Sequence, residues 1–176
     1  VVVVKCYRLR VSLLALLAAL ALWTGANRAA AQGQDPSWSE PLQLSNPQSE
    51  ASRATLVTDK YARVHAFWSE AYEDQSPIIQ YAVFDGQVWS SPIDVYVGLE
   101  VGNTLNFPAV VLDDKDAFHL VWVDSWSGSA YYTSAPLQGA GSARAWSEPL
   151  VIELPVHQPK LHVQTDGTVH LVYSSY

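Results

Sequence analysis

The sequence predicts an all-β fold built from four-stranded antiparallel units that repeat along the 176-residue chain, and three observations favour it. A six-residue phrase occurs three times, as SWSEPL (37–42), VWSSPI (88–93) and AWSEPL (145–150). Three longer tracts also align with one another, at 53–68, 108–122 and 159–173. Each tract contains two apolar runs around a polar turn, and the second run alternates its side chains with the two-residue period of a β-strand.

Each tract predicts a β-hairpin, because its turn is rich in residues that favour tight turns. In the first unit we expect strands near 54–59, 62–69, 77–84 and 87–95, and essentially no helix after residue 32. Four antiparallel strands in roughly 50 residues match one blade of a β-propeller. We therefore expect a β-propeller with about two and a half blades present. Its parts are an outer strand at 37–45, blades at 53–95 and 108–154, and a half blade at 159–176.

The repeated phrase is interpreted as the outermost strand of each blade, since its proline suits an edge that needs no backbone donor. The first copy precedes any hairpin. We therefore expect an incomplete propeller whose open blade edges favour self-association. Other recurrent positions are the histidine of each second strand and the aromatic residue three positions later. Together with the tryptophans of the phrase they are Trp38, Trp89, Trp146, His65, His119, His170, Trp68, Trp122 and Tyr173.

The histidines of the repeat lie 54 and 51 residues apart. Imidazole is a common metal ligand. However, equivalent positions in successive blades lie around a ring and do not converge on one ion. We expect each histidine to be hydrogen-bonded between packed blades, and no metal to be shared among them.

Residues 1–31 resemble a secretory signal peptide, with basic residues, an apolar run at 11–23 and small residues at 29–31. The sequence therefore predicts a secreted or extracytoplasmic protein. An uncleaved membrane anchor is the alternative, although the run is short of the ~20 residues that span a bilayer. After cleavage we expect no membrane association.

Removal of the predicted signal peptide changes the charge of the chain. It takes away four of the ten basic residues and none of the 17 acidic ones, which leaves a net charge of −11. Such a surface repels phosphate groups, so the sequence excludes nucleic acid as a partner. The single cysteine, Cys6, lies in this segment, so the remaining chain can form no internal disulfide.

The blade pattern, with the stretch YAVFDGQVWSSP at 81–92, resembles the sialidase-like β-propellers with bacterial neuraminidase-type repeats. The family's S-x-D-x-G-x-x-W motif is incomplete here: Gly86 and Trp89 match, but Ala82 and Phe84 replace the serine and the aspartate. The resemblance implies three arginines that clamp a substrate carboxylate. Only Arg53 falls where the first of them would lie, and an ordinary solvated charge is the other interpretation of that residue.

Two loops between predicted second and third strands pair acids with an aromatic residue, and they suggest a ligand surface. In the loop at 69–76 these are Tyr72 and Glu70, and in the loop at 124–129 they are Trp126 and Asp124. Aromatic rings stack on sugars and carboxylates accept sugar hydroxyls, so a glycan or an extracellular protein is a plausible partner. Packing of both rings against the next blade is the structural alternative.

The acidic run Asp113, Asp114 and Asp116 offers oxygen ligands of the kind that Ca²⁺ prefers. A solvated hairpin turn is the alternative, because the run matches no complete calcium loop. We expect no other cofactor.

These observations favour an exported sialidase-like β-propeller module that binds glycan or protein, or serves as a scaffold, without catalytic residues of its own. The alternative is the N-terminal part of a glycoside hydrolase of the exo-sialidase type, with its catalytic residues in later blades. A purely structural repeat of a larger surface protein is a third possibility.

Overall fold

The computed structural model describes residues 3–4, 39–152 and 155–175. Predictions that concern the signal peptide and Trp38 lie outside the described residues, apart from a short strand at residues 3–4. The chain divides into two compact units, residues 4–42 and the remainder, and the three larger sheets belong to the latter. Strands β1 (Val3–Val4) and β2 (Leu42–Gln43) form a separate two-stranded sheet.

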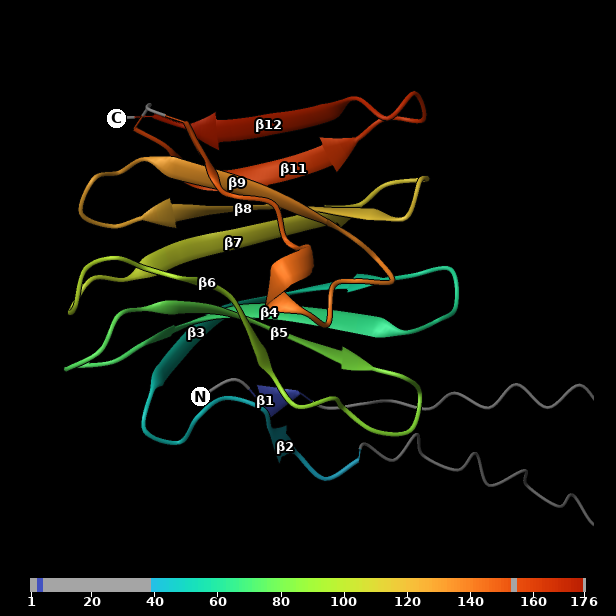
Figure 1. Ribbon diagram of the computed structural model, residues 1–176, viewed down its shortest axis with the longest axis horizontal. Coiled ribbons are helices and arrows are strands. Elements are labelled where there is room, and N and C mark those ends of the chain that lie inside the picture. The colour runs from blue at the N-terminus through green and yellow to red at the C-terminus, as the bar shows by residue number, and fades with distance from the viewer. Residues whose placement is uncertain (1–2, 5–38, 153–154, 176) are drawn as a thin grey trace, which may run out of the picture. The chain divides into compact units, whose positions relative to one another are not determined.

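The first large sheet contains four antiparallel strands in chain order (Figure 1). They are β3 (Glu50–Thr58), β4 (Val64–Ala71), β5 (Ile78–Phe84) and β6 (Ile93–Val97). Strand β4 is buried over nearly its whole length, as its two apolar faces predict.

The second large sheet repeats this order. Its strands are β7 (Leu105–Leu112), β8 (Ala117–Asp124), β9 (Ala130–Pro136) and β10 (Leu150–Ile152). A hairpin of β11 (His157–Val163) and β12 (Val169–Ser174) follows. Among the described residues the one helical segment is the short 3₁₀ turn η1 (Ala143–Ala145). The prediction of an all-β chain with four-stranded antiparallel sheets is confirmed.

The repeated tryptophan–proline phrase lies beside the outer strand and not within it, which corrects the prediction. Strand β6 begins only at Ile93 and β10 only at Leu150, each just after the proline of the phrase. Before the proline one serine contacts the third strand. The amide of Ser90 donates to Val83 O (2.8 Å) and that of Ser147 to Ser134 O (2.8 Å), and each serine hydroxyl accepts the amide of the same partner (3.1 Å). Proline interrupts the ladder because it has no amide hydrogen, so regular pairing starts after it.

The tryptophans of the phrase also differ from one another. Trp89 forms an isolated bridge with Phe84, and the two rings lie 5.4 Å apart at an angle of 37°. Trp146 is buried, and its Nε1–H donates to Ala140 O at 3.1 Å. Only the second of these contributes to the main core.

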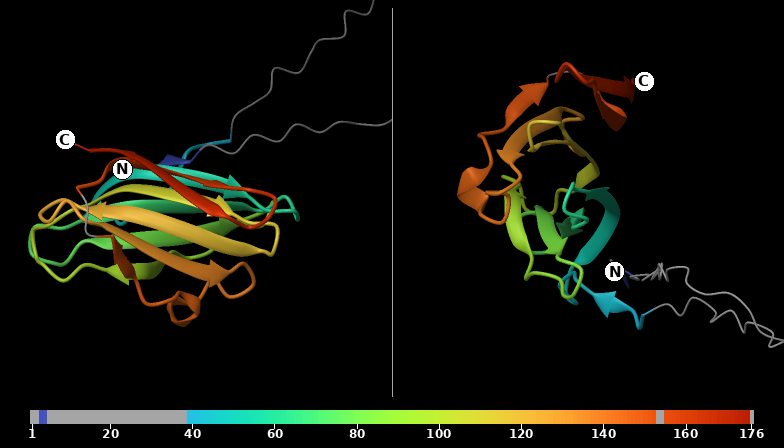
Figure 2. Two further views of the ribbon diagram at one scale, coloured as in Figure 1. Left: turned by 90° about the horizontal axis from the view of Figure 1, so that it is seen from above. Right: turned by 90° about the vertical axis from the view of Figure 1, so that its right-hand side faces the viewer.

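Aromatic side chains from the first and second sheets interlock to form the core. Phe118 is fully buried, and its ring lies 5.6 Å from that of Phe67 and 6.2 Å from that of Trp146. The first strands of the three sheets are neighbours, since β7 contacts both β3 and β11 (Figures 1 and 2). Successive sheets are therefore packed one upon the next.

The recurrent histidines link two strands within one sheet. His65 Nδ1 lies 2.8 Å from Tyr81 Oη and its Nε2 lies 3.2 Å from Asp59 Oδ2. An ionised carboxylate only accepts hydrogen bonds, so Nε2–H donates to Asp59 and Nδ1 accepts from the tyrosine hydroxyl. His119 repeats the arrangement with Tyr132 at 2.7 Å and Asp113 at 3.2 Å. Both histidines are therefore hydrogen-bonded within their own sheet, and the His65 ring also lies 4.8 Å from that of Phe118 in the second sheet.

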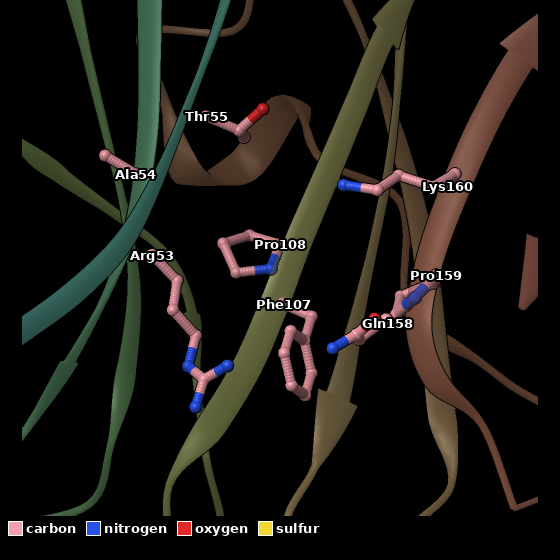
Figure 3. Close-up of a pocket in the computed structure, with 8 residues that line it drawn as sticks. All are labelled: Arg53, Ala54, Thr55, Phe107, Pro108, Gln158, Pro159 and Lys160. Carbon is pink, nitrogen blue, oxygen red and sulfur yellow. The ribbon is translucent and has the colours of Figure 1, made fainter. Parts of the chain in front are cut away.

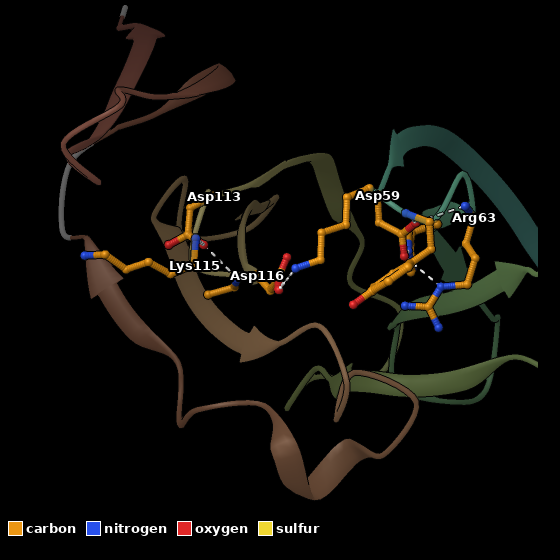
Figure 4. Close-up of polar contacts among 9 residues, drawn as sticks. Asp59, Arg63, Asp113, Lys115 and Asp116 are labelled. Carbon is orange, nitrogen blue, oxygen red and sulfur yellow. Dashed lines mark hydrogen bonds and ion pairs between the residues drawn. The ribbon is translucent and has the colours of Figure 1, made fainter.

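Each aspartate of these networks also closes its hairpin turn. Asp59 Oδ1 accepts the amides of Tyr61 and Arg63, and Asp113 Oδ1 accepts those of Lys115 and Ala117 (Figure 4). In the third hairpin the amide of Gln164 donates to Thr168 O, as Asp59 does to Arg63 O. Gln164 therefore takes the place of the aspartate, and Asp166 lies one position before the left-handed Gly167 (φ 86°).

The network around His65 predicts a stability that falls as the solution is acidified. Burial lowers the pKa of His65 against the opposing effect of Asp59. Between the unfolded pKa of about 6.5 and the lower folded value, the unfolded chain binds a proton that the folded chain does not, so stability is lost as pH falls through this window. Urea unfolding from pH 7 to pH 5 should show a smaller loss in His65→Gln than in the unchanged chain. An equal loss in both would contradict the assignment, and His170→Gln, at an exposed site, is the control.

Candidate functional site

Three equivalent irregularities in the first strands of the sheets define the candidate site. The pairing register shifts between Ser52 and Thr55 in β3, between Asn106 and Ala109 in β7, and between His157 and Lys160 in β11. Each shift contains a non-glycine residue in the left-handed region: Arg53 (φ 57°), Phe107 (φ 54°) and Gln158 (φ 50°). Such conformations cost about 1–3 kcal/mol each and cluster at ligand-binding sites.

The three bulges line one groove (Figure 3). Its volume is about 410 Å³, which lies within the range of small-molecule sites. Its remaining walls are Ala54, Thr55, Pro108, Pro159 and Lys160. The groove thus combines a cation from the first sheet, an aromatic ring from the second, and an amide and an ammonium group from the third.

The guanidinium group of Arg53 lies over the ring of Phe107, across the boundary between two sheets. Its guanidinium carbon is 4.0 Å from the centroid of the Phe107 ring (Figure 3). Among the described residues no carboxylate forms an ion pair with Arg53. Stacking leaves the planar N–H groups of a guanidinium available at its edge, so Arg53 can bind an anionic group bidentately.

The predicted residues Glu70 and Tyr72 are bonded to the fold and lie outside the residues that line this groove. Glu70 is only 2% exposed. Its Oε1 accepts hydrogen bonds from Trp68 Nε1 (2.8 Å) and the Asn46 amide (3.2 Å), and its Oε2 accepts one from the Tyr72 hydroxyl (2.7 Å). Burial, with a contribution from Glu70, raises the pKa of Tyr72 to about 12. Both side chains therefore anchor the loop that follows β4.

Asp124 is equivalent to Glu70 in the second sheet and also organises its loop. Its Oδ1 accepts the amides of Trp126 (3.1 Å) and Ser127 (2.8 Å), and its Oδ2 accepts Asn103 Nδ2. Asp124 does not reach Trp122 in the way that Glu70 reaches Trp68, and Trp122 Nε1 is buried without a hydrogen-bond partner among the described residues. Trp126 itself is 64% exposed. Of the two predicted aromatic residues it is the one whose ring is available to a ligand.

Two of the three carboxylates in the acidic run of the second hairpin already bind other residues of the chain. Asp113 closes its turn and binds His119, and Asp116 pairs with Lys60 of the first sheet (Figure 4). Asp114 is exposed. Within the described part of the chain no three His, Cys, Asp or Glu side chains are grouped so as to hold a metal ion.

Sequence reasoning missed Phe107, Gln158 and Lys160 as site residues. Arg53, Phe107 and Gln158 are separated by the same 54 and 51 residues as the repeated histidines, so they occupy equivalent positions. A signal existed in the dipeptides FP (107–108) and QP (158–159), because proline within a strand often marks a bulge. The left-handed backbone could not be predicted from the sequence, because arginine, phenylalanine and glutamine are not residue types that favour a positive φ.

Two further findings bear on identity. Neither the family models nor the curated proteins with which the sequence was compared match it. In the described residues no helix has the length and apolar character needed to cross a membrane.

Proposed function

We propose that the three sheets are blades of an exported, sialidase-like β-propeller, and that this chain is a non-catalytic module that binds acidic glycans in the groove of Arg53, Phe107 and Gln158. The observation that carries the proposal is the convergence of three equivalent, strained bulges on one groove. If these bulges served only the geometry of the fold, glycine would suit them better, because it adopts a positive φ without a steric cost.

The sheet arrangement supports the propeller part of the proposal. Both complete sheets are four-stranded antiparallel meanders, and their first strands are neighbours. In a propeller the first strands of all blades surround a common axis, so the bulges of β3, β7 and β11 would face that axis together. A ligand bound there contacts several blades at once.

The chemistry of the groove supports an acidic sugar as the ligand. Arg53 and Lys160 supply positive charge in a chain whose net charge is −7. Phe107, Pro108 and Pro159 offer apolar surface for the C–H face of a sugar ring, and the Gln158 amide can donate to and accept from hydroxyl groups.

The hydrolase alternative has one observation in its favour, the hydrogen bond from the Tyr72 hydroxyl to Glu70. Sialidases, which the blade pattern resembles, attack their substrate with a tyrosine that a glutamate activates. Two features argue against a nucleophilic Tyr72. Its raised pKa, about 12, keeps the phenol protonated at neutral pH. Glu70 already binds Trp68 and Asn46 and is buried. The pair is better explained as a loop anchor.

Titration calorimetry with sialyllactose and with neutral lactose tests the proposed function. We expect the unchanged chain to bind the acidic sugar more tightly, and Arg53→Ala to bind it at least about tenfold more weakly, because a charged hydrogen-bonded contact contributes about 1.5–3 kcal/mol. Lactose binding should change little.

Arg144→Ala is the matched control, since Arg144 is exposed in η1 and does not line the groove. It should bind as the unchanged chain does. Equal affinities for Arg53→Ala and the unchanged chain, or a preference for lactose, would overturn the proposal. Circular dichroism of each variant verifies that the fold is retained.

A further inference from the structure

The groove of the three bulges is positively charged, although the chain as a whole is acidic. Arg53 and Lys160 line it, and none of its eight lining residues is Asp or Glu. The whole chain, by contrast, contains 17 acidic and 10 basic residues. Within the part of the chain that the structure describes, neither cation forms an ion pair with a carboxylate. A concave surface lined by charge of one sign attracts ligands of the opposite sign, and this groove has two cations to balance.

The two cations lie at different levels of the groove. Arg53 occupies the bulge position of β3, and Gln158 occupies the equivalent position of β11. Lys160 lies two residues further along β11, which corresponds to about 6.6 Å of strand. In Figure 3 the two charged groups do not point toward one another: the guanidinium lies beside Phe107, whereas the Lys160 side chain extends toward β7. One carboxylate bound at Arg53 therefore leaves Lys160 without an anionic partner.

The surroundings of the two cations suit different anions. Thr55 occupies in β3 the position that Lys160 occupies in β11, and both line the groove. An ammonium group is a compact charge with three N–H donors, and together with a threonine hydroxyl it suits a tetrahedral oxyanion. The guanidinium group of Arg53 has the planar fork that fits a carboxylate. The groove thus offers two anion positions of different geometry.

The charge at Lys160 favours a sulfate ester over a phosphate ester. A phosphate monoester carries a charge of about −1.5 to −2 at pH 7, which one lysine does not balance. A sulfate ester carries a single negative charge, so Lys160 neutralises it fully. The excess charge of a phosphate would be repelled by a chain whose net charge is −7.

We propose that the groove binds a sugar with two different anionic groups, a carboxylate at Arg53 and a sulfate ester at Lys160 and Thr55. The inference rests on the proposed function and narrows its ligand from acidic glycans in general to sulfated oligosaccharides of uronic acids. The sugar rings that join the two groups lie against the apolar surface of Phe107 and Pro108.

Titration calorimetry with chondroitin disaccharides tests the inference on the full chain. The unsulfated disaccharide carries only the uronic carboxylate, and its 4-sulfated and 6-sulfated forms add one sulfate ester each at a known place. We expect at least one sulfated form to bind about five- to tenfold more tightly than the unsulfated one. This gain should shrink as the salt concentration rises, because salt screens the contact with the lysine.

Variants of the chain assign the two anions to their residues. Lys160→Gln should bind the sulfated and unsulfated disaccharides equally, with the affinity for the unsulfated one changed less than about twofold. Lys160→Arg should keep the gain, since it keeps the charge. Arg53→Ala should weaken the unsulfated disaccharide about tenfold. Lys115→Gln is the matched control, because Lys115 is exposed and does not line the groove, and it should leave the gain unchanged.

The outcomes separate this inference from the proposed function. If no disaccharide binds in a way that depends on Arg53, both are wrong. If the unsulfated disaccharide binds through Arg53 but neither sulfate adds affinity, the inference alone is overturned. The same holds if the gain survives Lys160→Gln or is lost equally in Lys115→Gln. Thermal unfolding equal to that of the unchanged chain verifies that each lysine variant is folded.

Discussion

Replacing Asp59 with alanine is expected to lower the free energy of unfolding by about 3–5 kcal/mol, because it leaves the His65 ring N–H and two turn amides without their acceptor, at about 1–3 kcal/mol for each unsatisfied buried group. The carboxylate accepts hydrogen bonds from the amides of Tyr61 and Arg63, from Arg63 Nε (2.7 Å) and from His65. Burial alone would raise the pKa of Asp59, but these hydrogen bonds outweigh it and lower the pKa to about 2. The carboxylate is therefore ionised in the folded chain at any ordinary pH.

Urea unfolding at pH 7 measures this change. Asp114→Ala is the control, because Asp114 lies at the exposed position that follows the equivalent Asp113 in the second hairpin. It should alter stability by no more than about 0.5 kcal/mol, as surface substitutions generally do. If Asp59→Ala proved as mild as the control, the network would not stabilise the fold as described.

Replacing Phe118 with alanine is expected to cost about 3–5 kcal/mol, the usual result of emptying a buried aromatic site. The ring of Phe118 is fully buried and lies 4.8 Å from that of His65 as well as close to Phe67 and Trp146. It belongs to the second sheet and fills the space against the first. The variant thus reports on the packing of one sheet upon another.

Phe84→Ala provides the matched control for Phe118→Ala. Phe84 is only partly buried, and its ring contacts that of Trp89 within the first sheet. Its loss should cost clearly less in thermal or urea unfolding. Equal losses would show that the aromatic contacts between the sheets contribute no more than a contact within one sheet.

Much of the strand order could be predicted from the sequence, because alternation and turn residues act locally. The hairpin turns at 59–63 and 113–117 lie where their polar residues indicated. The fourth strand of each sheet begins later in the chain than the sequence predicts. It starts after the proline of the repeated phrase and does not include the tryptophan. Trp146 instead packs into the core, where its indole N–H binds the loop at 137–145. A contact of this kind produces no periodic pattern in the sequence.

The candidate site was predicted only in part, for a physical reason. Loop acids such as Glu70 and Asp124 are visible in a sequence, but their roles as acceptors for Trp68 or Asn103 depend on distances between strands. Likewise, Arg53 could be named, but its partner Phe107 lies 54 residues away on another sheet. Convergence of equivalent bulges is a property of packed repeats and not of any one segment.

Chemical-shift mapping of ¹⁵N-labelled protein during titration with sialyllactose tests most directly whether the three bulges form a binding groove. The account predicts that the largest amide shifts fall in three separate segments, at 53–55, 107–109 and 158–160, with the proline positions silent, and that Arg53→Ala abolishes them together. Shifts confined to one segment, shifts at Trp126 alone, or no response at millimolar sugar would contradict it.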